Sequence, residues 1–381
     1  MVTIGALREF QDLHCYLAGR SKVHQETVAP FRRMLILVAL AVSTTLAVNS
    51  PTVKEFLARP TPKYAEQLTG EALVDYVNEH QPFFKAEYSP NVMAFTESRL
   101  MDAKYLVKPK EDEILQDVVL DDDDVLPDSF DARQHWPQCE SIGHIRDQSA
   151  CGSCWAVSSA EVMSDRLCVQ SNATMKMLLS DTDILSCCGR TCGLGCKGGY
   201  VIEAFRYWTR EGVCTGGRYK QKNVCKPYAF YPCGQHKDQP YYGACPQGSW
   251  NTPLCRKKCQ FKYAVTYGED KIKGKSAYFL KMDEDVIKRE IIRNGPVVGA
   301  FRVYEDFSHY KGGIYVHTGG AKKGAHAVKV IGWGSENGTD YWLIANSWNT
   351  DWGENGGYFR ILRGENHCGI EEQMVAGMAD L

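Results

Sequence analysis

The alternation of apolar and polar residues divides the chain into helical and extended stretches. Residues 68–77 repeat apolar positions every three or four residues, which predicts an amphipathic helix. Residues 154–168 show the same spacing after a Gly-Ser turn, so we expect a helix that begins at Cys154. Residues 327–331 and 341–345 are short, apolar or β-branched and bounded by glycine or asparagine, as strands are. The pattern predicts a helical first part of the folded region and a strand-rich second part.

The composition changes abruptly near Leu126. From residue 48 to residue 124 the chain has no cysteine and ends in an acidic run, which is typical of a solvated, flexible linker. The acidic residues are Glu111, Asp112, Glu113, Asp117 and Asp121 to Asp124. After Leu126, cysteine, glycine, tryptophan and tyrosine become frequent, and no internal repeat is visible. We therefore expect an N-terminal segment, a linker and then a separate folded region.

A hydrophobic run lies close to the N-terminus. Two arginines precede Met34, and residues 35–48 are apolar apart from one serine and two threonines. This arrangement predicts a secretory signal peptide at residues 34–47. The run of about 15 residues is shorter than the roughly 20 that span a bilayer, so we expect no stable membrane anchor. Residues 1–33 are then an N-terminal extension of doubtful status.

Charge and cysteine content indicate the kind of protein. The formal net charge is −2, so we expect no basic surface for nucleic acid. Of 16 cysteines, all but one follow Leu126, a density typical of disulfide-bonded proteins of the secretory pathway. Zinc bound by the cysteines of residues 187–196 is the alternative, and the lack of paired C-x-x-C modules argues against it. We expect no metal and no cofactor. Two N-x-[ST] triplets, at Asn172 and Asn337, predict glycosylation.

One cysteine lies in a motif with a known chemical role. The residues Gln148-Ser-Ala-Cys-Gly-Ser-Cys-Trp155 contain the pattern C-G-[SA]-C-[WY] that surrounds a proteolytic nucleophile. A helix N-terminus and a neighbouring imidazolium are expected to stabilise the thiolate of Cys154 by lowering its pKa. The amide of Gln148 and the backbone N–H of Cys154 are expected to donate to the oxyanion. A structural or disulfide cysteine is the default alternative, and the motif argues against it. Because a nucleophile stays unpaired, we exclude Cys154 from the disulfides.

A histidine and an asparagine complete the predicted catalytic group. Among ten histidines, His326 lies between small residues at the start of an apolar stretch, which leaves room for a substrate backbone. An isolated histidine there would more often be structural, but the motif around Cys154 favours a proton-transfer partner. Asn346 supplies an oxygen that orients the imidazole, and Trp348 is expected to shield that contact from water. The predicted catalytic residues are therefore Cys154, His326, Asn346 and Gln148.

On these motifs the chain resembles the cathepsin B group of papain-like cysteine peptidases, from about Leu68 to the C-terminus. The resemblance implies an α+β, papain-like two-domain fold: a helical left domain and a β-barrel-like right domain, with the active site in the cleft between them. It implies cleavage of protein or peptide substrates by a mature domain at residues 126–381, with residues 48–125 as the enzyme's own inhibitory propeptide. It also implies a monomer, inhibition by cystatin-type proteins, and a lysosomal or extracellular location such as a gut lumen.

The spacing of the catalytic pair indicates an insertion. Cys154 and His326 are 326 − 154 = 172 residues apart, whereas roughly 130 to 150 residues separate the pair in papain-type enzymes. The resemblance identifies the insertion as an occluding loop at residues 225–259, which adds dipeptidyl carboxypeptidase activity. It further implies these substrate-binding residues: Gly198, Gly199, Tyr200, Ala327, Gln373, His236 and Trp348.

The resemblance also implies six disulfides. The implied pairs are Cys139 with Cys168, Cys151 with Cys196, Cys187 with Cys255, Cys188 with Cys192, Cys225 with Cys259, and Cys233 with Cys245. Cys214 and Cys368 remain, and the sequence does not decide whether they are free or paired with each other.

Two positions depart from the family pattern. The family's loop carries two adjacent histidines that grip a substrate's C-terminal carboxylate, one of which also pairs with an aspartate; here these positions are Gln235 and His236. Gln235 can offer Asp147 only a neutral hydrogen bond, so we expect a looser loop and reduced exopeptidase relative to endopeptidase activity. Gln373 stands where a glutamate is common at the base of the principal specificity pocket. We therefore expect apolar side chains to be preferred over arginine two residues before the scissile bond.

The segment at residues 341–354 resembles gut cathepsin B enzymes of blood-feeding worms, which makes haemoglobin digestion a hypothesis. The alternative from another class is a non-catalytic, disulfide-rich secreted binding protein on a papain-like scaffold. Such a protein is expected to have lost Cys154, His326 or Gln148, and all three are present. A dinucleotide site at residues 332–334 fails because no third glycine follows at the required spacing.

Overall fold

The structure, a computed structural model, describes residues 51–115 and 125–381. The helices are α1 (Val53–Leu57), α2 (Gly70–His80), α3 (Val92–Glu97), α4 (Ala132–His135), α5 (Cys154–Gln170), α6 (Asp181–Cys187), α7 (Val201–Glu211), α8 (Glu284–Asn294) and α9 (Glu305–Ser308). The strands are β1 (Phe84–Ala86), β2 (Ile114–Leu115), β3 (Phe130–Asp131), β4 (Tyr278–Leu280), β5 (Val297–Tyr304), β6 (Tyr310–Tyr315), β7 (Lys322–Glu336), β8 (Thr339–Ala345), β9 (Tyr358–Leu362) and β10 (Val375–Ala376). The predicted signal peptide and N-terminal extension lie outside the described residues. Within the described part, no helix is long and apolar enough to cross a membrane.

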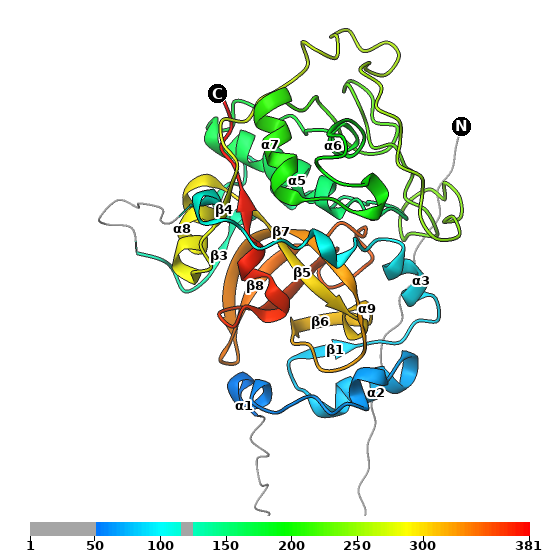
Figure 1. The fold of residues 1–381 in the computed structure, drawn as a ribbon, viewed down its shortest axis with the longest axis vertical. Coiled ribbons are helices and arrows are strands. Elements are labelled where there is room, and N and C mark those ends of the chain that lie inside the picture. The colour runs from blue at the N-terminus through cyan, green and yellow to red at the C-terminus, as the bar shows by residue number, and fades with distance from the viewer. Residues whose placement is uncertain (1–50, 116–124) are drawn as a thin grey trace, which may run out of the picture. The chain divides into compact units, whose positions relative to one another are not determined.

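The folded region has two halves, which Figure 1 shows as a group of helices beside a group of strands. Helices α5, α6 and α7 form the first half, and their apolar side chains, such as Phe205 and Trp208, share one core. The second half is a sheet with the strand order β1-β6-β9-β8-β7-β5-β10-β4-β2, to which β3 adds by pairing with β7. Trp333, Trp342 and Phe359 lie in the core of this half. The predicted order, helices first and strands second, is confirmed.

The predicted helix and strands around the motifs are present, with longer bounds. Helix α5 begins at Cys154, as predicted, and every residue from Cys154 to Cys168 is buried. It contains no glycine or proline, so nothing in its sequence interrupts the helical hydrogen bonds. The two predicted strands form the centres of β7 and β8, which pair antiparallel. Asn337 and Gly338 connect them with φ angles of 52° and 75°, the conformation of a tight type I′ hairpin turn.

Residues 51–115, here called the covering segment, pack along both halves. Helix α2, which the hydrophobic pattern predicts, buries Leu73, Val74 and Val77 against the sheet half. Strand β1 pairs antiparallel with β6, and β2 pairs parallel with β4. Between these strands the segment crosses from one side of the sheet half to the other, along the boundary with the helices (Figure 1).

The expectation of a flexible acidic linker is wrong for its first part. Residues Glu111–Glu113 form a 3₁₀ helix, and the next two residues form β2. The carboxylate of Glu113 accepts a hydrogen bond from the Lys110 backbone and forms an ion pair with Arg206 of α7. An acidic residue with a basic partner on a neighbouring helix is held in place, which a count of charges along the sequence does not reveal. Residues 116–124 of the predicted linker lie outside the described residues.

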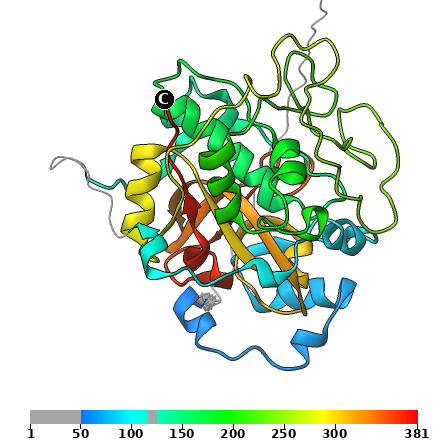
Figure 2. The ribbon, with the colours of Figure 1, turned by 45° about the horizontal axis from the view of Figure 1, so that its top comes forward.

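The loop of residues 225–259 extends from the helical half toward α3 of the covering segment, as both views show (Figures 1 and 2). Helices and strands are absent from this part of the described chain. Two disulfides, Cys225–Cys259 and Cys233–Cys245, hold it together instead. The predicted insertion is therefore a covalently closed loop beside the covering segment.

Candidate active site

Cys154 is the first residue of α5, and its side chain is buried beneath the covering segment. Backbone groups of Met101 in the covering segment and of Ala327 in β7 lie against its sulfur atom. Burial raises the pKa of the Cys154 thiol to about 12, although these backbone groups act in the opposite direction. The expected lowering of this pKa is therefore not found in the covered protein. Loss of water disfavours the thiolate more strongly than the helix N-terminus favours it.

His326 and Asn346 lie side by side on neighbouring strands. The imidazole Nε2 of His326, in β7, donates to Asn346 Oδ1, just after β8, over 2.7 Å. The backbone N–H of Ser347 donates to the same oxygen, which fixes the Asn346 side chain. His326 Nδ1 is buried and has no hydrogen-bond partner among the described residues, so this nitrogen is free to exchange a proton. The ring of Trp348 stacks on the imidazole at a centroid distance of 4.6 Å and is fully buried, as a shield requires.

Burial also determines the charge of His326. It lowers the pKa of the imidazole to about 4, while the hydrogen bond to Asn346 acts in the opposite direction. Together with the raised pKa of Cys154, this keeps the pair as a neutral thiol and a neutral imidazole under the covering segment. Access of water to the site would remove the main cause of both shifts.

The side-chain amide of Gln148 is fixed by contacts at both ends. Its Oε1 accepts hydrogen bonds from Ser347 Oγ at 2.7 Å and from Trp348 Nε1 at 3.1 Å. Its Nε2 donates to the carbonyl oxygen of Arg99, in the covering segment, at 2.8 Å. The predicted oxyanion donor thus already holds a peptide carbonyl. Sequence reasoning missed Ser347, because a serine beside Asn346 carries no signal that its hydroxyl turns toward Gln148.

The covering segment continues past the nucleophile as an extended peptide. Met101 exchanges two backbone hydrogen bonds of 2.9 Å with Ala325, immediately before His326. Farther along, the ring of Tyr105 lies against Gly198, where a Cβ atom would come within 2.6 Å of the ring. A side chain at position 198 would therefore displace the peptide. The segment occupies the path that a substrate backbone would take.

The remaining predicted substrate-binding residues surround the same path. The ring of Tyr200 meets Tyr105 edge-on at a centroid distance of 4.9 Å, and a Cβ on Gly199 would strike Trp155. Gln373 Nε2 donates to the carbonyl oxygen of Val107 at 2.8 Å. A residual cavity of about 10 Å³ remains beside Gln373. Its apolar lining residues are Tyr105, Val107, Val201, Ile202, Phe279, Ala300 and Val375. The structure thus places Gln373 in an apolar pocket that the covering segment fills.

The loop of residues 225–259 is anchored by His236. Its Nδ1 lies 3.0 Å from Asp351 Oδ1, and its Nε2 lies 3.5 Å from Asp147 Oδ2. The expectation that Gln235 would hydrogen-bond to Asp147 is wrong, because His236 lies between the carboxylates of Asp147 and Asp351. The hydrogen bond to Asp351 is the main cause that raises the pKa of His236. His236 is buried in this arrangement and does not point freely into the cleft.

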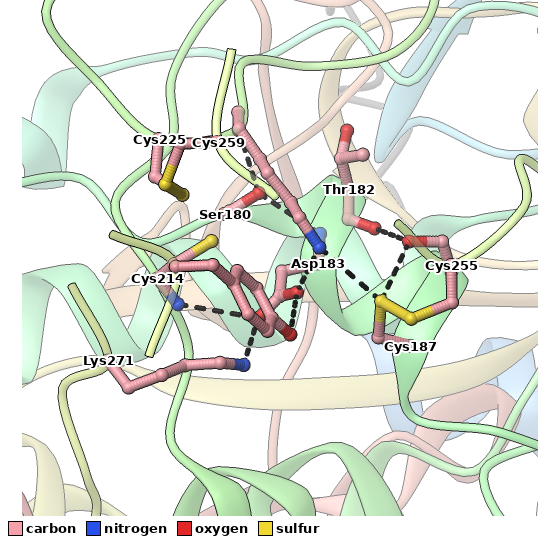
Figure 3. Close-up of polar contacts among 12 residues, drawn as sticks. Ser180, Thr182, Asp183, Cys187, Cys214, Cys225, Cys255, Cys259 and Lys271 are labelled. Carbon is pink, nitrogen blue, oxygen red and sulfur yellow. Dashed lines mark hydrogen bonds and ion pairs between the residues drawn. A yellow bond between two sulfur atoms is a disulfide. The ribbon is translucent and has the colours of Figure 1, made fainter. Parts of the chain in front are cut away.

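A second anchor holds the base of the loop. Figure 3 shows Asp183, from α6, with the side chain of Lys271 pointing toward it, in the region that also holds the Cys225–Cys259 disulfide. Lys226 Nζ lies 2.7 Å from Asp183 Oδ1, and Lys271 pairs with the other oxygen. The pairing with two ammonium groups outweighs burial and lowers the pKa of Asp183. The loop therefore starts from a buried cluster in which one carboxylate pairs with two ammonium groups.

The cysteines and the candidate glycosylation sites have clear positions. The structure joins the six pairs implied by the resemblance, and it leaves Cys154, Cys214 and Cys368 as free thiols. Cys214 and Cys225 come close to the Asp270 carboxylate, but Cys225 is already bound in a disulfide and is not a free metal ligand. The side chains of Asn172 and Asn337 are exposed, at the end of α5 and in the β7–β8 turn.

This arrangement supports one type of chemistry. A thiol at a helix start, an imidazole with a free nitrogen and an amide that holds a carbonyl oxygen are the groups that acyl transfer through a thioester needs. A family model described as "Papain family cysteine protease" matches residues 126–378. The chain belongs to the papain family of cysteine proteases.

Within this family the similar proteins are cathepsin B-like. Cathepsin B-like cysteine proteinase 5 of Caenorhabditis elegans is 49% identical over 326 residues, which cover 84% of this chain and 94% of that protein. Cathepsin B-like cysteine proteinase 1 of Haemonchus contortus is 48% identical, covering 86% of this chain and 93% of that protein. A gut-specific cysteine proteinase of Caenorhabditis elegans is 48% identical, and the match covers 82% of this chain and 92% of that protein.

A solved structure has the same fold together with an N-terminal segment. ProCathepsin B S9 from Trypanosoma congolense has a TM-score of 0.68 and 37% identity, and the match covers 83% of this chain and all of that chain. The predicted α+β, papain-like fold and the predicted cathepsin B-like cysteine peptidase are thereby confirmed. The alternative of a non-catalytic binding protein is not favoured.

Proposed function

We propose that the chain is the zymogen of a cysteine endopeptidase with Cys154 as nucleophile, His326 as proton-transfer partner and Asn346 as the residue that orients the imidazole. The Cys154 thiolate attacks the substrate carbonyl, and Gln148 with the Cys154 backbone N–H binds the oxyanion. His326 then protonates the leaving amine, and water hydrolyses the resulting thioester. The observation that supports this most strongly is the Arg99 carbonyl oxygen, 2.8 Å from Gln148 Nε2. We infer that the reacting carbonyl of a substrate takes the place of this peptide carbonyl.

We further propose that residues 48–125 are the inhibitory propeptide and residues 126–381 the mature enzyme. The covering segment binds at Gln148, Ala325 and Gln373, so substrates cannot enter until it leaves. Val125 is 89% exposed, which makes the proposed boundary accessible to a protease. Protein and peptide substrates, a monomeric state and inhibition by cystatin-type proteins belong to this proposal.

The proposal includes passage through the secretory pathway, with the mature enzyme lysosomal or released, for example into a gut lumen. Six disulfides, the exposed candidate glycosylation sites and the printed name of the gut-specific relative support this location.

Labelling of the nucleophile tests the catalytic assignment. The full chain is acidified to release the covering segment and then treated with an epoxide that alkylates reactive thiols. We expect one label, absent from Cys154→Ala and retained in Cys214→Ala and Cys368→Ala, which remove the other two free thiols of the described residues. A label that survives Cys154→Ala would refute the assignment.

We also propose that exopeptidase activity is reduced relative to endopeptidase activity. The reason differs from the looser loop expected from the sequence, because His236 is engaged with Asp351 and Asp147 and is not free to bind a C-terminal carboxylate. Dipeptide release and internal cleavage are to be compared on peptides of one sequence. Strong dipeptide release that His236→Gln alone abolishes would contradict this proposal.

A further inference from the structure

A large cavity lies on the side of the molecule that carries the loop. It has a volume of about 860 Å³ and lies between α3 of the covering segment, the loop and the end of α9. The course of the covering segment indicates which side of a substrate the cavity would receive. Residues 101–107 run from Cys154 toward Gln373, whereas residues 87–99 line the cavity in the opposite direction. If the Gln373 pocket binds the acyl side of a substrate, as the proposed function holds, this cavity receives the leaving-group side.

One wall of the cavity contains polar groups without partners. Ser308 and His309, at the end of α9, are each 2% exposed. Ser308 Oγ and both ring nitrogens of His309 have no hydrogen-bond partner of ordinary geometry among the described residues, although the Glu87 backbone lies near the imidazole. Buried polar groups are normally paired, because leaving one unpaired costs free energy. These groups therefore have unused capacity to bind a polar ligand.

The covering segment packs on this wall. The backbone N–H of Glu87 donates to the carbonyl oxygen of His309 at 2.8 Å, and the ring of Tyr88 lies 6.1 Å from the imidazole. Next to them, Glu87 Oε2 lies 3.8 Å from Lys311 Nζ. A peptide with an acidic side chain thus already lies on this wall. When the covering segment leaves, Ser308, His309 and Lys311 become available to the substrate.

The charges around the wall favour an anionic ligand. Glu305 and Asp306, the acidic residues nearest His309 on its own element, are paired with Lys323 at 3.2 Å and His317 at 3.0 Å. Across the cavity, Asp351 is paired with His236. The acidic groups that face His309 in the mature part therefore already have partners, whereas Lys311 loses its partner when Glu87 departs.

The opposite wall of the cavity, which belongs to the loop, has no equivalent group that is free to bind an anion. Gln235 carries no charge, and His236 is engaged with two carboxylates. We propose that, in the enzyme freed of its covering segment, His309, Ser308 and Lys311 bind a carboxylate on the leaving-group side of the substrate. This inference rests on the proposed function, since it assigns a substrate preference to the same site.

The preference depends on pH through His309. Under the covering segment, burial lowers the pKa of this imidazole, and Glu305 acts in the opposite direction. Once hydrated, an imidazole titrates near an ordinary value of about 6.5, and a carboxylate of the substrate near about 4. Between these values both groups are charged and attract each other. Above this range only Lys311 contributes.

The test uses mature enzyme and internally quenched peptides of one sequence. One pair of peptides carries Glu or Gln at the first or second leaving-group position. A second pair ends two residues after the scissile bond in a free carboxylate or an amide. We expect wild-type enzyme to cleave the carboxylate member of at least one pair about fivefold more efficiently by kcat/KM at pH 5, and less so at pH 8. The pair that responds shows whether a side chain or a chain end supplies the carboxylate.

Variants assign the preference to this wall. His309→Gln keeps a polar side chain and is expected to abolish the pH-dependent part of the preference, while Lys311→Gln lowers the preference at both pH values. The matched controls His135→Gln and Lys281→Gln, both outside the cavity lining, are expected to keep the wild-type ratio. No preference in wild type, or a preference unchanged in both His309→Gln and Lys311→Gln, would overturn the inference. Failure to cleave the neutral peptides, together with absent labelling of Cys154, would overturn the proposed function as well.

Discussion

At the scale of single residues, the site depends on contacts that hold Gln148 in one orientation. An amide can present its oxygen or its nitrogen to the cleft, and the two donors Ser347 and Trp348 fix the oxygen on the inner side. The nitrogen must then face the Arg99 carbonyl. The proposed oxyanion donor is therefore oriented before any substrate arrives, which is how such donors lower a barrier.

We expect Ser347→Ala to lower kcat/KM about fivefold, since it removes one neutral hydrogen bond worth about 1 kcal/mol. Gln148→Ala, which removes the donor itself, is expected to cost about 10²- to 10³-fold in kcat. Ser335→Ala, on the exposed end of β7, is the matched control. Steady-state kinetics of the mature enzyme on one fluorogenic peptide measure all three. A loss in Ser347→Ala as small as in Ser335→Ala would show that Trp348 alone orients Gln148.

Gln373 provides a second prediction at this scale. Its amide lies in an apolar pocket and cannot neutralise an arginine side chain of a substrate. We expect wild-type enzyme to cleave Phe-Arg fluorogenic substrates more efficiently than Arg-Arg substrates. Gln373→Glu is expected to raise the ratio of Arg-Arg to Phe-Arg cleavage about tenfold, because it supplies a charge-assisted hydrogen bond. A wild-type preference for Arg-Arg would contradict this reading of the pocket.

At the scale of elements, the loop of residues 225–259 is held by disulfides and by charge rather than by secondary structure. Protonated His236 bridges Asp351 and Asp147, and its pKa is raised mainly by the hydrogen bond to Asp351. A raised pKa means that this stabilisation is complete below the ordinary value of about 6.5 and is lost as the pH rises through the higher folded value. The loop is therefore anchored most firmly in acid.

Hydrogen exchange of the loop amides, corrected for intrinsic exchange rates, measures this effect. We expect protection in residues 225–259 to fall between about pH 6 and pH 8 in the wild-type chain. His236→Gln is expected to show weak protection at both pH values, whereas His135→Gln behaves like wild type. Equal protection of the wild-type loop across this range would show that the disulfides alone hold it.

The elements also show what the sequence can and cannot predict. The start of α5, the strands around His326 and the position of Asn346 follow local patterns, and the sequence predicts them. The sequence does not predict the partner of His236, because Asp351 lies 115 residues away and is brought near only by folding. For the same reason the sequence did not predict that Glu113 would order the first part of the acidic run through Arg206.

At the scale of the whole molecule, one buried acid in α5 affects stability. Glu161 is 2% exposed, and neither carboxylate oxygen has a hydrogen-bond partner among the described residues. Burial raises its pKa to about 7, against the opposing effect of Lys329 and Arg146. The folded protein thus holds this proton more tightly than the unfolded chain does. The corresponding stabilisation is present at low pH and is lost as the pH rises from about 4.5 past about 7.

We expect Glu161→Gln to raise the thermal midpoint of the full chain by a few degrees more at pH 8 than at pH 5, because glutamine stays neutral at both values. Scanning calorimetry at one scan rate, in a Cys154→Ala background that prevents self-cleavage, makes the comparison. Glu365→Gln, an exposed position, is the control. An equal shift at both pH values would show that packing, and not ionisation, accounts for the effect.

The peptide that fills the cleft belongs to the same polypeptide as the cleft itself. While they are joined, each molecule presents its own inhibitor at an effective concentration on the order of millimolar, however dilute the solution. A cut between residues 115 and 126 removes this tether but leaves the contacts at Gln148, Ala325 and Gln373 intact. The cut chain then becomes an ordinary bimolecular complex, whose dissociation depends on how much protein is present. At a pH that leaves these contacts intact, we therefore expect dilution to complete activation, so a concentrated store of cut enzyme remains inhibited and one released into a larger volume does not.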